Sequence, residues 1–462
     1  MTHIGSIQVL TDEISNWTRF CQYAAYIRQV RLDDFTDARI DPSVWLHLLS
    51  KSGGQGLPLV PRLQSLSYAL VGPYQTSLLL FLSPSLRQLD VYFSWRPEDW
   101  GDVKRQEGAV NMLLRTACTA CPELDDLRLS NLQLLGPLCA AVEGLQHRLR
   151  KLTLSSLEIS DPNVIRALAE ITTLECLSGI NVKFDPAQRS LPVRGFRSLK
   201  HLSLVCSAAE DASLLLACIA SPLSSLDICS FAPSPLRWQD ELAVIGPMVP
   251  SLKSCTLELL PEPLGNPPEV LYMAQLLQGL FALRRLEAFS LLVRDAALVA
   301  DDATFEALAK AWPRLASFAL DGGLLTSSPT LLALAHFATH CPALHTLLLP
   351  HLTDRDRDQG RLPRGRRLPS QGALRRLSFY MLEGMSVHDP EAAGRVVWQL
   401  FPNLDIQGAC RVLPVHKVTP AEEDEAGDEE HERAWAAKRD AGRDAWVAVL
   451  ETVQDLQFEK AR

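Results

Sequence analysis

The stretch Leu124-Asp-Asp-Leu127-Arg-Leu129 returns as Leu149-Arg-Lys-Leu152-Thr-Leu154, as Leu174-Glu-Cys-Leu177 and as Leu199-Lys-His-Leu202-Ser-Leu204. Each copy begins 25 residues after the one before it. A constant spacing of one short apolar pattern indicates a chain built from stacked repeats, in which each repeat covers the apolar face of its neighbour.

Further copies of the pattern extend the repeat in both directions. They begin at Leu63, Leu86, Leu223, Leu252, Leu283, Leu315, Leu344 and Leu374, with weaker copies at Ile27 and Leu404. Leu-x-x-Leu-x-Leu is the strand segment of leucine-rich repeats, whose usual period is roughly 20–29 residues. We therefore predict an α/β leucine-rich-repeat solenoid, a right-handed β-α superhelix shaped like the ribonuclease-inhibitor horseshoe. Its parallel strands line a concave face and its helices lie outside.

Helical periodicity fills the segments between the strand patterns. It occurs in residues 109–120, 161–170, 211–220, 240–248, 304–312, 329–340 and 390–400. Asp161-Pro162 and Asp389-Pro390 are helix-start signals, and a proline such as Pro122 or Pro342 ends a helix before the next strand. Common repeats place Asn or Cys three residues after the third apolar residue. Here that place holds Leu132, Leu157, Ser207, Phe231 and Leu352, so we expect no asparagine ladder.

Three regions give the predicted domain organisation. Residues 1–26 form an N-terminal helical segment, residues 27–410 form the solenoid, and residues 411–462 form an acidic linker and a C-terminal helix. Within the solenoid, residues 351–372 contain six Arg and three Asp without apolar periodicity. We expect a solvated inserted loop there, with a basic docking loop for an acidic partner as the alternative. Helical spacing over residues 433–458 predicts a cap on the open end of the solenoid.

Composition and charge exclude several classes of protein. Of the 462 residues, 47% are hydrophobic and 21% charged, which is a globular composition. The net charge of −9 arises mostly from eight acids between Glu422 and Glu432, so the rest is nearly neutral. We therefore expect no nucleic-acid partner. No apolar run reaches the roughly 18 residues of a membrane span, so we expect no membrane partner. Eleven scattered cysteines without a secretory signal predict reduced thiols and a cytoplasmic or nuclear location.

No sequence motif points to catalysis. Cys118-x-x-Cys121 is a lone pair, whereas a structural zinc site needs four ligands. The glycine-rich loops of nucleotide sites are missing from the sequence, as are the nucleophile-elbow and His-Glu-x-x-His patterns. His336 and His340 lie four residues apart, but we expect no acidic partner beside them and favour a packing role. The prediction is a non-enzyme with no catalytic residue, no cofactor and no metal.

The candidate binding surface is the concave face. Its side chains come from variable positions between the strand leucines, or one place further along the same face. The candidate partner-binding residues are Asp90, Tyr92, Arg128, Ser155, Asp227, Glu258, Glu287, Asp321 and Tyr380. The face as a whole is small or polar without one dominant charge, which favours a selective protein surface. Tyr92 and Tyr380 are the better anchors, because aromatic residues are enriched at interface hot spots.

The segment before the first repeat carries a family resemblance. Its residues are Trp17, Arg19, Phe20, Tyr23, Ala24, Arg28, Val30 and Leu32. This stretch, running directly into degenerate repeats, resembles the F-box/leucine-rich-repeat proteins of basidiomycete fungi, where it links the F-box to the repeats. The resemblance implies a substrate receptor for a Skp1-cullin-type ubiquitin ligase, with its target held on the repeats.

The F-box itself is not found in the printed sequence. That module opens with a Leu-Pro-x-Glu-like motif, and no such motif stands before Trp17. A Skp1-like adaptor is thus expected as a partner only where an F-box is supplied upstream. The alternative is a stand-alone leucine-rich-repeat regulatory scaffold or inhibitor without a ubiquitin link.

Overall fold

A computed structural model gives the fold of the chain. It describes residues 17–32, 48, 50–51, 58–70, 77–93, 103–132, 138, 144–155, 157–184, 194–231, 237–260, 270–294, 296–322, 324–325, 327, 329–353, 370–379, 387–406 and 428–462. The chain divides into two compact units. The first contains residues 1–205 and 214–221, and the second contains residues 206–213 and 222–462.

The first unit is a parallel sheet whose strands follow the chain order. They are β1 (Gln29–Leu32), β2 (Ser65–Leu70), β3 (Gln88–Phe93), β4 (Asp126–Ser130), β5 (Lys151–Ser155), β7 (Cys176–Val182) and β8 (His201–Cys206), and β6 (Glu158–Ile159) pairs with β7. Its helical segments are α1 (Trp17–Ala24), η1 (Ser77–Phe81), α3 (Val103–Ala120) and α5 (Pro162–Ala169). The helix α6 (Ala209–Ala217) contributes residues to both units.

The second unit repeats the same plan. Its main sheet contains β9 (Ser225–Ser230), β10 (Ser254–Leu259), β12 (Ala288–Val293), β14 (Ser317–Asp321), β16 (Thr346–Leu349) and β17 (Arg376–Phe379). A second parallel sheet contains β11 (Val270–Tyr272), β13 (Ala297–Val299) and β15 (Leu324–Leu325). The helical segments are α7 (Arg237–Met248), α8 (Met273–Leu277), η4 (Gln278–Ala282), α9 (Asp302–Ala311), α10 (Leu331–His340), α11 (Pro390–Leu400) and α13 (Asp428–Ala461).

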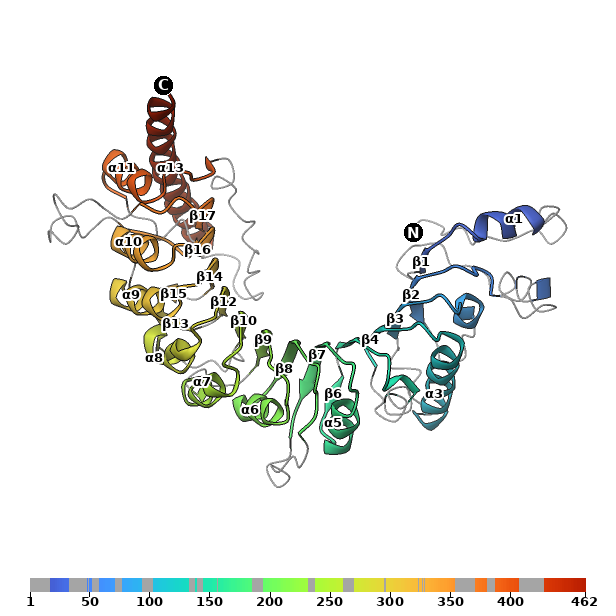
Figure 1. The fold of residues 1–462 in the computed structure, drawn as a ribbon. Helices are drawn as coiled ribbons and strands as arrows, with labels where there is room; N and C mark the ends of the chain where they lie inside the picture. The colour runs from blue at the N-terminus through green and yellow to red at the C-terminus, as the bar shows by residue number, and fades with distance from the viewer. Residues whose placement is uncertain are drawn as a thin grey trace. The chain divides into compact units, whose positions relative to one another are not determined.

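Parallel strands in chain order, separated by helical segments, confirm the predicted α/β leucine-rich-repeat fold. In each unit the helices that follow the strands lie on one side of the main sheet (Figure 1). The leucines explain this layering, because alternate strand side chains point to opposite faces. Leu127, Leu152 and Leu177 are register partners on neighbouring strands, and all three are buried under the helices. Each buried leucine contributes about 1.5–3 kcal/mol relative to exposure.

The register of β12 differs from the predicted one. The pattern starting at Leu283 was expected to place Leu286 inside the strand, yet Phe289 occupies that position opposite Cys255. The strand motif is therefore Leu286-Glu-Ala-Phe289-Ser-Leu291. Leu283 instead ends the 3-10 segment η4. Leucines spaced by three occur in both frames, and the larger buried Phe289 fixes the observed one by filling the core.

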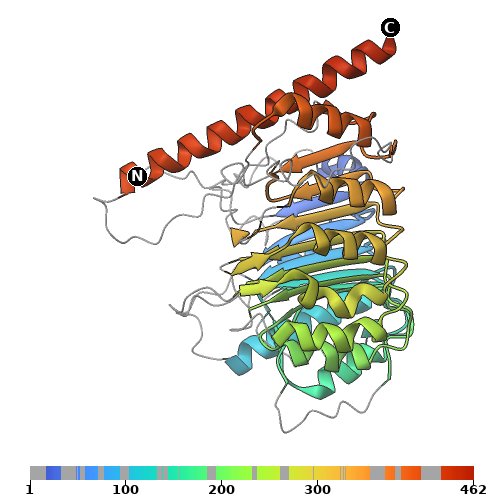
Figure 2. The same cartoon turned by 90° about the vertical axis from the view of Figure 1, so that its left-hand side faces the viewer.

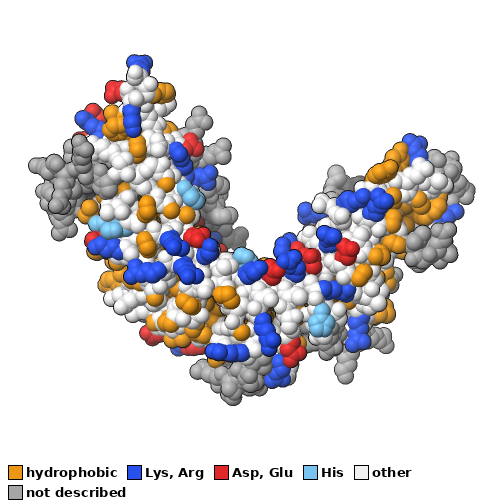
Figure 3. Space-filling model, in the orientation of Figure 1, with side chains coloured by type: hydrophobic (Ala, Val, Ile, Leu, Met, Phe, Trp, Pro, Cys, Tyr) orange, Lys and Arg blue, Asp and Glu red, His pale blue; other side chains and the backbone are white. Residues whose placement is uncertain are grey.

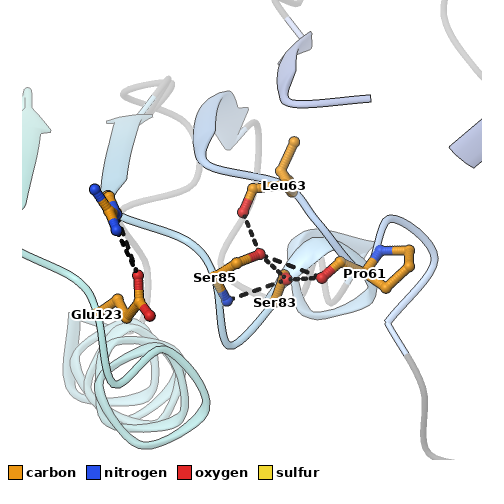
Figure 4. A network of polar contacts seen from close by, with 6 residues as sticks. Pro61, Leu63, Ser83, Ser85 and Glu123 are labelled. Atoms are coloured by element: carbon orange, nitrogen blue, oxygen red, sulfur yellow. Dashed lines mark hydrogen bonds and ion pairs between the residues drawn. The ribbon is translucent and has the colours of Figure 1, made fainter. Parts of the chain in front are cut away.

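A row of side-chain donors at the turns before the strands links successive repeats. Ser85 and Ser83 bridge to the preceding turn: Ser85 Oγ donates to the Leu63 carbonyl at 3.1 Å, and Ser83 Oγ donates to the Pro61 carbonyl at 2.7 Å (Figure 4). The equivalent leucine carbonyl recurs as acceptor. The Leu149 carbonyl accepts from Thr173 Oγ1 at 2.8 Å, the Leu199 carbonyl from Ser221 Oγ at 2.6 Å, and the Leu344 carbonyl from Gln371 Nε2 at 2.8 Å. We call these contacts the turn row.

The turn row gives the repeats side-chain hydrogen bonds to backbone carbonyls of the preceding turn. At the ladder position, Leu132, Leu157 and Leu352 are buried. One related contact exists at a neighbouring position, where Asn131 Nδ2 donates to the Phe93 carbonyl at 2.7 Å. Asn131 has φ 59°, a conformation that Asn tolerates better than most residues.

The long helix α13 covers the β17 end of the second unit (Figure 2). Trp446 packs edge-on against Phe379 with 4.7 Å between ring centroids, and Val449 and Val453 are fully buried. Gly394 of α11 allows this close approach, because a Cβ there would lie 2.6 Å from the Thr452 Cβ. These contacts place α13 where the sequence predicts a cap.

Residues near both ends of the predicted solvated loop at 351–372 are buried, so the predicted bounds are too wide. His351, Leu352 and Thr353 are buried at its start, and Gln371 is buried near its end. Thr353 forms a β-bridge with Thr330, and Gln371 hydrogen-bonds the turn before β16 and the Leu374 amide. The rest of the predicted loop, residues 354–369, lies outside the described residues.

Candidate protein-binding face

The face of each sheet opposite the helices, which we call the open face, carries the variable side chains of the strands. In the first unit, one row across it is given by the register. This row contains Arg31, Ser67, Asp90, Arg128, Thr153 and Ser178. Neighbouring strands lie roughly 4.8 Å apart, so adjacent members of the row can contact one ligand together.

Arg128 is the best-organised side chain of this row. Its Nε and Nη2 donate to the two carboxylate oxygens of Asp126, each at 3.3 Å. The hydrogen bond to Asp126 raises the pKa of Arg128, and the charge of Asp90 acts in the same direction. The guanidinium is therefore held in a fixed orientation by one neighbour while its side chain remains partly exposed.

Tyr92 lies one place further along the same face. Its side chain is 38% exposed, and its register partner on β4 is Ser130, which in turn faces Ser155 on β5. An aromatic ring beside small hydroxyl side chains, with Asp90 and Arg128 in the adjacent row, forms a mixed polar and apolar surface. Such a surface can anchor an apolar side chain and hydrogen-bond its flanking backbone.

An ion-pair network borders the open face of the first unit at the strand starts. Glu175 contacts Arg150, whose Nε donates at 3.0 Å, and Lys200, whose Nζ donates at 2.9 Å. These hydrogen bonds, first from Lys200 and then from Arg150, lower the pKa of Glu175 to about 2. The network ties the turns before β5, β7 and β8 together.

We expect Glu175→Gln to lower stability more at neutral pH than in acid. The folded pKa of about 2 lies below the usual unfolded value of roughly 4.3, so the charged form stabilises the fold above the unfolded pKa. This stabilisation is lost as the pH falls toward 2. For a partly exposed network we expect about 1 kcal/mol at most. Urea midpoints at pH 7 and pH 3 measure the effect.

Glu158→Gln is the matched control for that prediction, because the Glu158 carboxylate stands 3.9 Å from Lys183. We expect its urea midpoint to equal that of the wild type at both pH values. An unchanged gap between wild type and Glu175→Gln from pH 7 to pH 3 would contradict the assigned role of Glu175.

The open face of the second unit carries acidic side chains in the middle and at the ends of its strands, whereas the row across the first unit also contains arginines. Asp227 on β9, Glu258 on β10 and Asp321 on β14 are half-buried on it, and its other strand positions are mostly hydroxyl or apolar. Glu258 is the register partner of Cys229. Burial raises the pKa of Cys229 to about 11, and Glu258 adds to this shift. Cys229 is therefore a protonated thiol at neutral pH.

The structure places seven of the nine predicted site residues on the open face. These are Asp90, Tyr92, Arg128, Ser155, Asp227, Glu258 and Asp321. Tyr380 lies outside the described residues. Glu287 was expected between strand leucines and instead precedes β12, where it contacts Lys253 at 3.1 Å. The register shift explains this error, and it puts Ser290, which was not a candidate, on the open face.

The buried thiols and the paired histidines have packing roles. Cys118 and Cys121 are buried, and burial raises the pKa of each to about 11. Among the described residues, no group of three His, Cys, Asp or Glu side chains could hold a metal ion. The expectation that His336 has no acidic neighbour is wrong. Burial lowers the pKa of His336, but Glu306 and Asp302 of α9 are close enough to oppose this shift.

In the described part of the chain, no helix is both long enough and apolar enough to cross a membrane.

Comparisons with known proteins give structural likeness only. No protein-family model matches the chain, and no curated protein matches it. The chain is similar to a chain of the Rad7–Elc1 complex from yeast, at 17% identity and a TM-score of 0.37, covering 63% of this chain and 70% of that one. It is similar to an internalin, InlF, from Listeria monocytogenes, at 13% identity and a TM-score of 0.30, covering 64% of this chain and 87% of that one. It is also similar to the leucine-rich-repeat-containing protein LegL7 from Legionella pneumophila, at 12% identity and a TM-score of 0.34, covering 64% of this chain and 90% of that one.

Proposed function

We propose that the chain is a non-catalytic protein-interaction scaffold that serves as the substrate receptor of a Skp1-cullin-type ubiquitin ligase. The open face carries this proposal. In each unit it presents rows of partly exposed polar side chains that the core does not require, since the core is filled by the opposite set of leucines. A standard interface buries roughly 800 Å² on each partner, and a few adjacent strands supply that area.

The region around Tyr92 is the proposed centre of target binding. Tyr92 supplies a large exposed ring, and the Arg128 guanidinium beside it is already oriented by Asp126. Oriented side chains lose little conformational entropy when a partner binds, so they contribute more to affinity than mobile ones. Tyrosine and arginine are also the residue types most enriched at hot spots.

The helix α1 supports the ubiquitin-ligase part of the proposal. Its segment carries the residues of the F-box/leucine-rich-repeat resemblance, and several of its large side chains are exposed. Phe20 is 37% exposed, Tyr23 is 59% exposed and Tyr26, just after the helix, is 76% exposed. Exposed aromatic residues that adjoin one another suit packing against a further helical module.

Replacing Tyr92 and Arg128 together with alanine is expected to weaken target capture about tenfold or more, as loss of two hot-spot residues does. Proximity labelling in cells, compared quantitatively between wild type and variant, measures the capture. Tyr272→Ala is the matched control, because Tyr272 is 52% exposed but lies on the other sheet of the second unit. Equal loss in both variants would exclude the Tyr92 region as the binding centre.

Co-purification with Skp1 tests the ligase link directly. We expect the full-length gene product to recover Skp1 together with a cullin. A specific target bound without Skp1 favours the alternative, a stand-alone regulatory scaffold or inhibitor that has no ubiquitin link.

A further inference from the structure

Exposed cations follow one another along the strand-start turns of the second unit. We call this set the basic strip, and it contains Arg285, Arg314, His345, Arg375 and Arg376, all of them exposed. Arg285 and Arg314 hold equivalent positions, each directly before the first leucine of its repeat. On the face seen in Figure 3, Lys and Arg side chains outweigh acidic ones along the part of this unit from β10 to β17.

Backbone hydrogen bonds fix the spacing of the strip. The amide of Ala316 donates to the Glu287 carbonyl at 2.7 Å. In the next two turns the His345 amide donates to the Ala316 carbonyl at 2.8 Å, and the Arg375 amide donates to the His345 carbonyl at 3.0 Å. The turns before β12, β14, β16 and β17 are therefore neighbours. At roughly 4.8 Å per strand the cations span about 15 Å, the length of four or five residues of extended peptide.

The fold engages two members of the strip: Arg375 Nη1 donates to the Asn403 carbonyl at 3.1 Å, and His345 Nδ1 lies 3.0 Å from the Thr346 hydroxyl. The other three cations have no such contact with a described residue. Within the described residues, Arg285, Arg314 and Arg376 form no ion pair, whereas the adjacent Arg284 donates to the carbonyls of Lys310 and Ala311. The nearby acid Glu287 is already engaged by Lys253 at 3.1 Å. Cations in one row that are not neutralised internally repel each other, and an anionic ligand removes that repulsion.

We propose that the basic strip docks a short, extended acidic segment of a partner protein. The proposal rests on the scaffold function proposed above and names the chemistry of one part of its partner. A protein segment fits better than nucleic acid because the same sheet carries Asp227, Glu258 and Asp321 further along its strands. A phosphate backbone that left the strip across the sheet would meet these carboxylates, whereas a peptide can change charge from residue to residue.

Fluorescence anisotropy with the full chain tests the strip. The probes are a labelled glutamate decapeptide, a glutamine decapeptide and a ten-nucleotide oligothymidylate. The test variant is Arg285→Glu with Arg314→Glu. The matched control is Arg115→Glu with Arg197→Glu, two exposed arginines of the first unit that give the same change in net charge. We expect the wild type and the control to bind the glutamate peptide, and the test variant to bind it about tenfold more weakly.

A charge-swap arm checks that a loss of binding reflects the strip and not the fold. The test variant should gain affinity for a lysine decapeptide, which an unfolded site would not do. No glutamate-peptide binding by the wild type, equal weakening in both variants, or tighter binding of the oligothymidylate than of the peptide would overturn the proposal. The Tyr92 and Arg128 capture assay reports on the other unit, so failure of the scaffold function and failure of the strip are distinguishable.

Discussion

Trp312→Ala is expected to destabilise the second unit by about 3–5 kcal/mol, the range measured for large aromatic residues replaced in cores. Trp312 is fully buried between repeats. Its ring packs against Phe289 with 4.7 Å between centroids and against Phe281 at 6.1 Å. Its Nε1 donates to the Leu280 carbonyl at 3.1 Å, so the substitution also leaves a buried acceptor without its donor. Urea unfolding followed by circular dichroism measures the change.

The control for this prediction is Trp312→Phe. It keeps most of the apolar volume while it removes the indole N–H, so we expect a smaller loss of about 1–2 kcal/mol. If both variants lost the same stability, the lost packing of the Trp312 ring against Phe289 and Phe281 would not be the main cost, and this prediction would be wrong.

Gln371→Ala should remove about 3 kcal/mol, although a single polar side chain is lost. Gln371 is only 4% exposed. Its Nε2 donates to the carbonyls of Cys341, Pro342 and Leu344 at 3.1, 3.3 and 2.8 Å, and its Oε1 accepts from the Leu374 amide at 3.1 Å. Each buried group left unsatisfied costs about 1–3 kcal/mol, and water does not readily replace one side chain that serves two turns.

Asn403→Ala provides the graded comparison. Asn403 also donates to the preceding turn, through one hydrogen bond of 3.0 Å to the Gly372 carbonyl, but it is exposed. Water can replace its side chain, so we expect a loss below about 1 kcal/mol. Similar losses for Gln371→Ala and Asn403→Ala would show that burial does not set the strength of the turn row.

The strands could be predicted because their pattern is both local and repeated. In the 124–204 region each leucine pattern forms a strand at its expected place, and Pro122 marks the turn between α3 and β4. The error at Glu287 has a local cause as well. Leu283, Leu286 and Phe289 are equally spaced, and only the fit against Cys255 on β10 selects the frame. Such a long-range choice leaves no signal in one repeat read by itself.

The sequence predicts which residues of the candidate site share a face, but it does not predict the side-chain contacts between them. Alternation along a strand predicts that Tyr92 and Arg128 share a face, and they do. It does not reveal that Asp126 orients Arg128, because that contact depends on side-chain conformation. The second sheet of β11, β13 and β15 was also missed, since its strands have two or three residues and no recurring pattern. The arginines before the repeat leucines were visible in the sequence, but their alignment in a strip required the register.

The turn row has a consequence for how such a chain can change its length. The Leu404 carbonyl, at the last repeat, accepts from Gln457 of α13 at 3.2 Å, as Leu63 accepts from Ser85 and Leu344 from Gln371. The terminal helix thus presents the same chemical connector that an internal repeat would present. A duplication or loss of a repeat that carries this contact leaves its junctions with one donor and one acceptor each. Copy number can therefore drift during evolution while the ends stay unaltered.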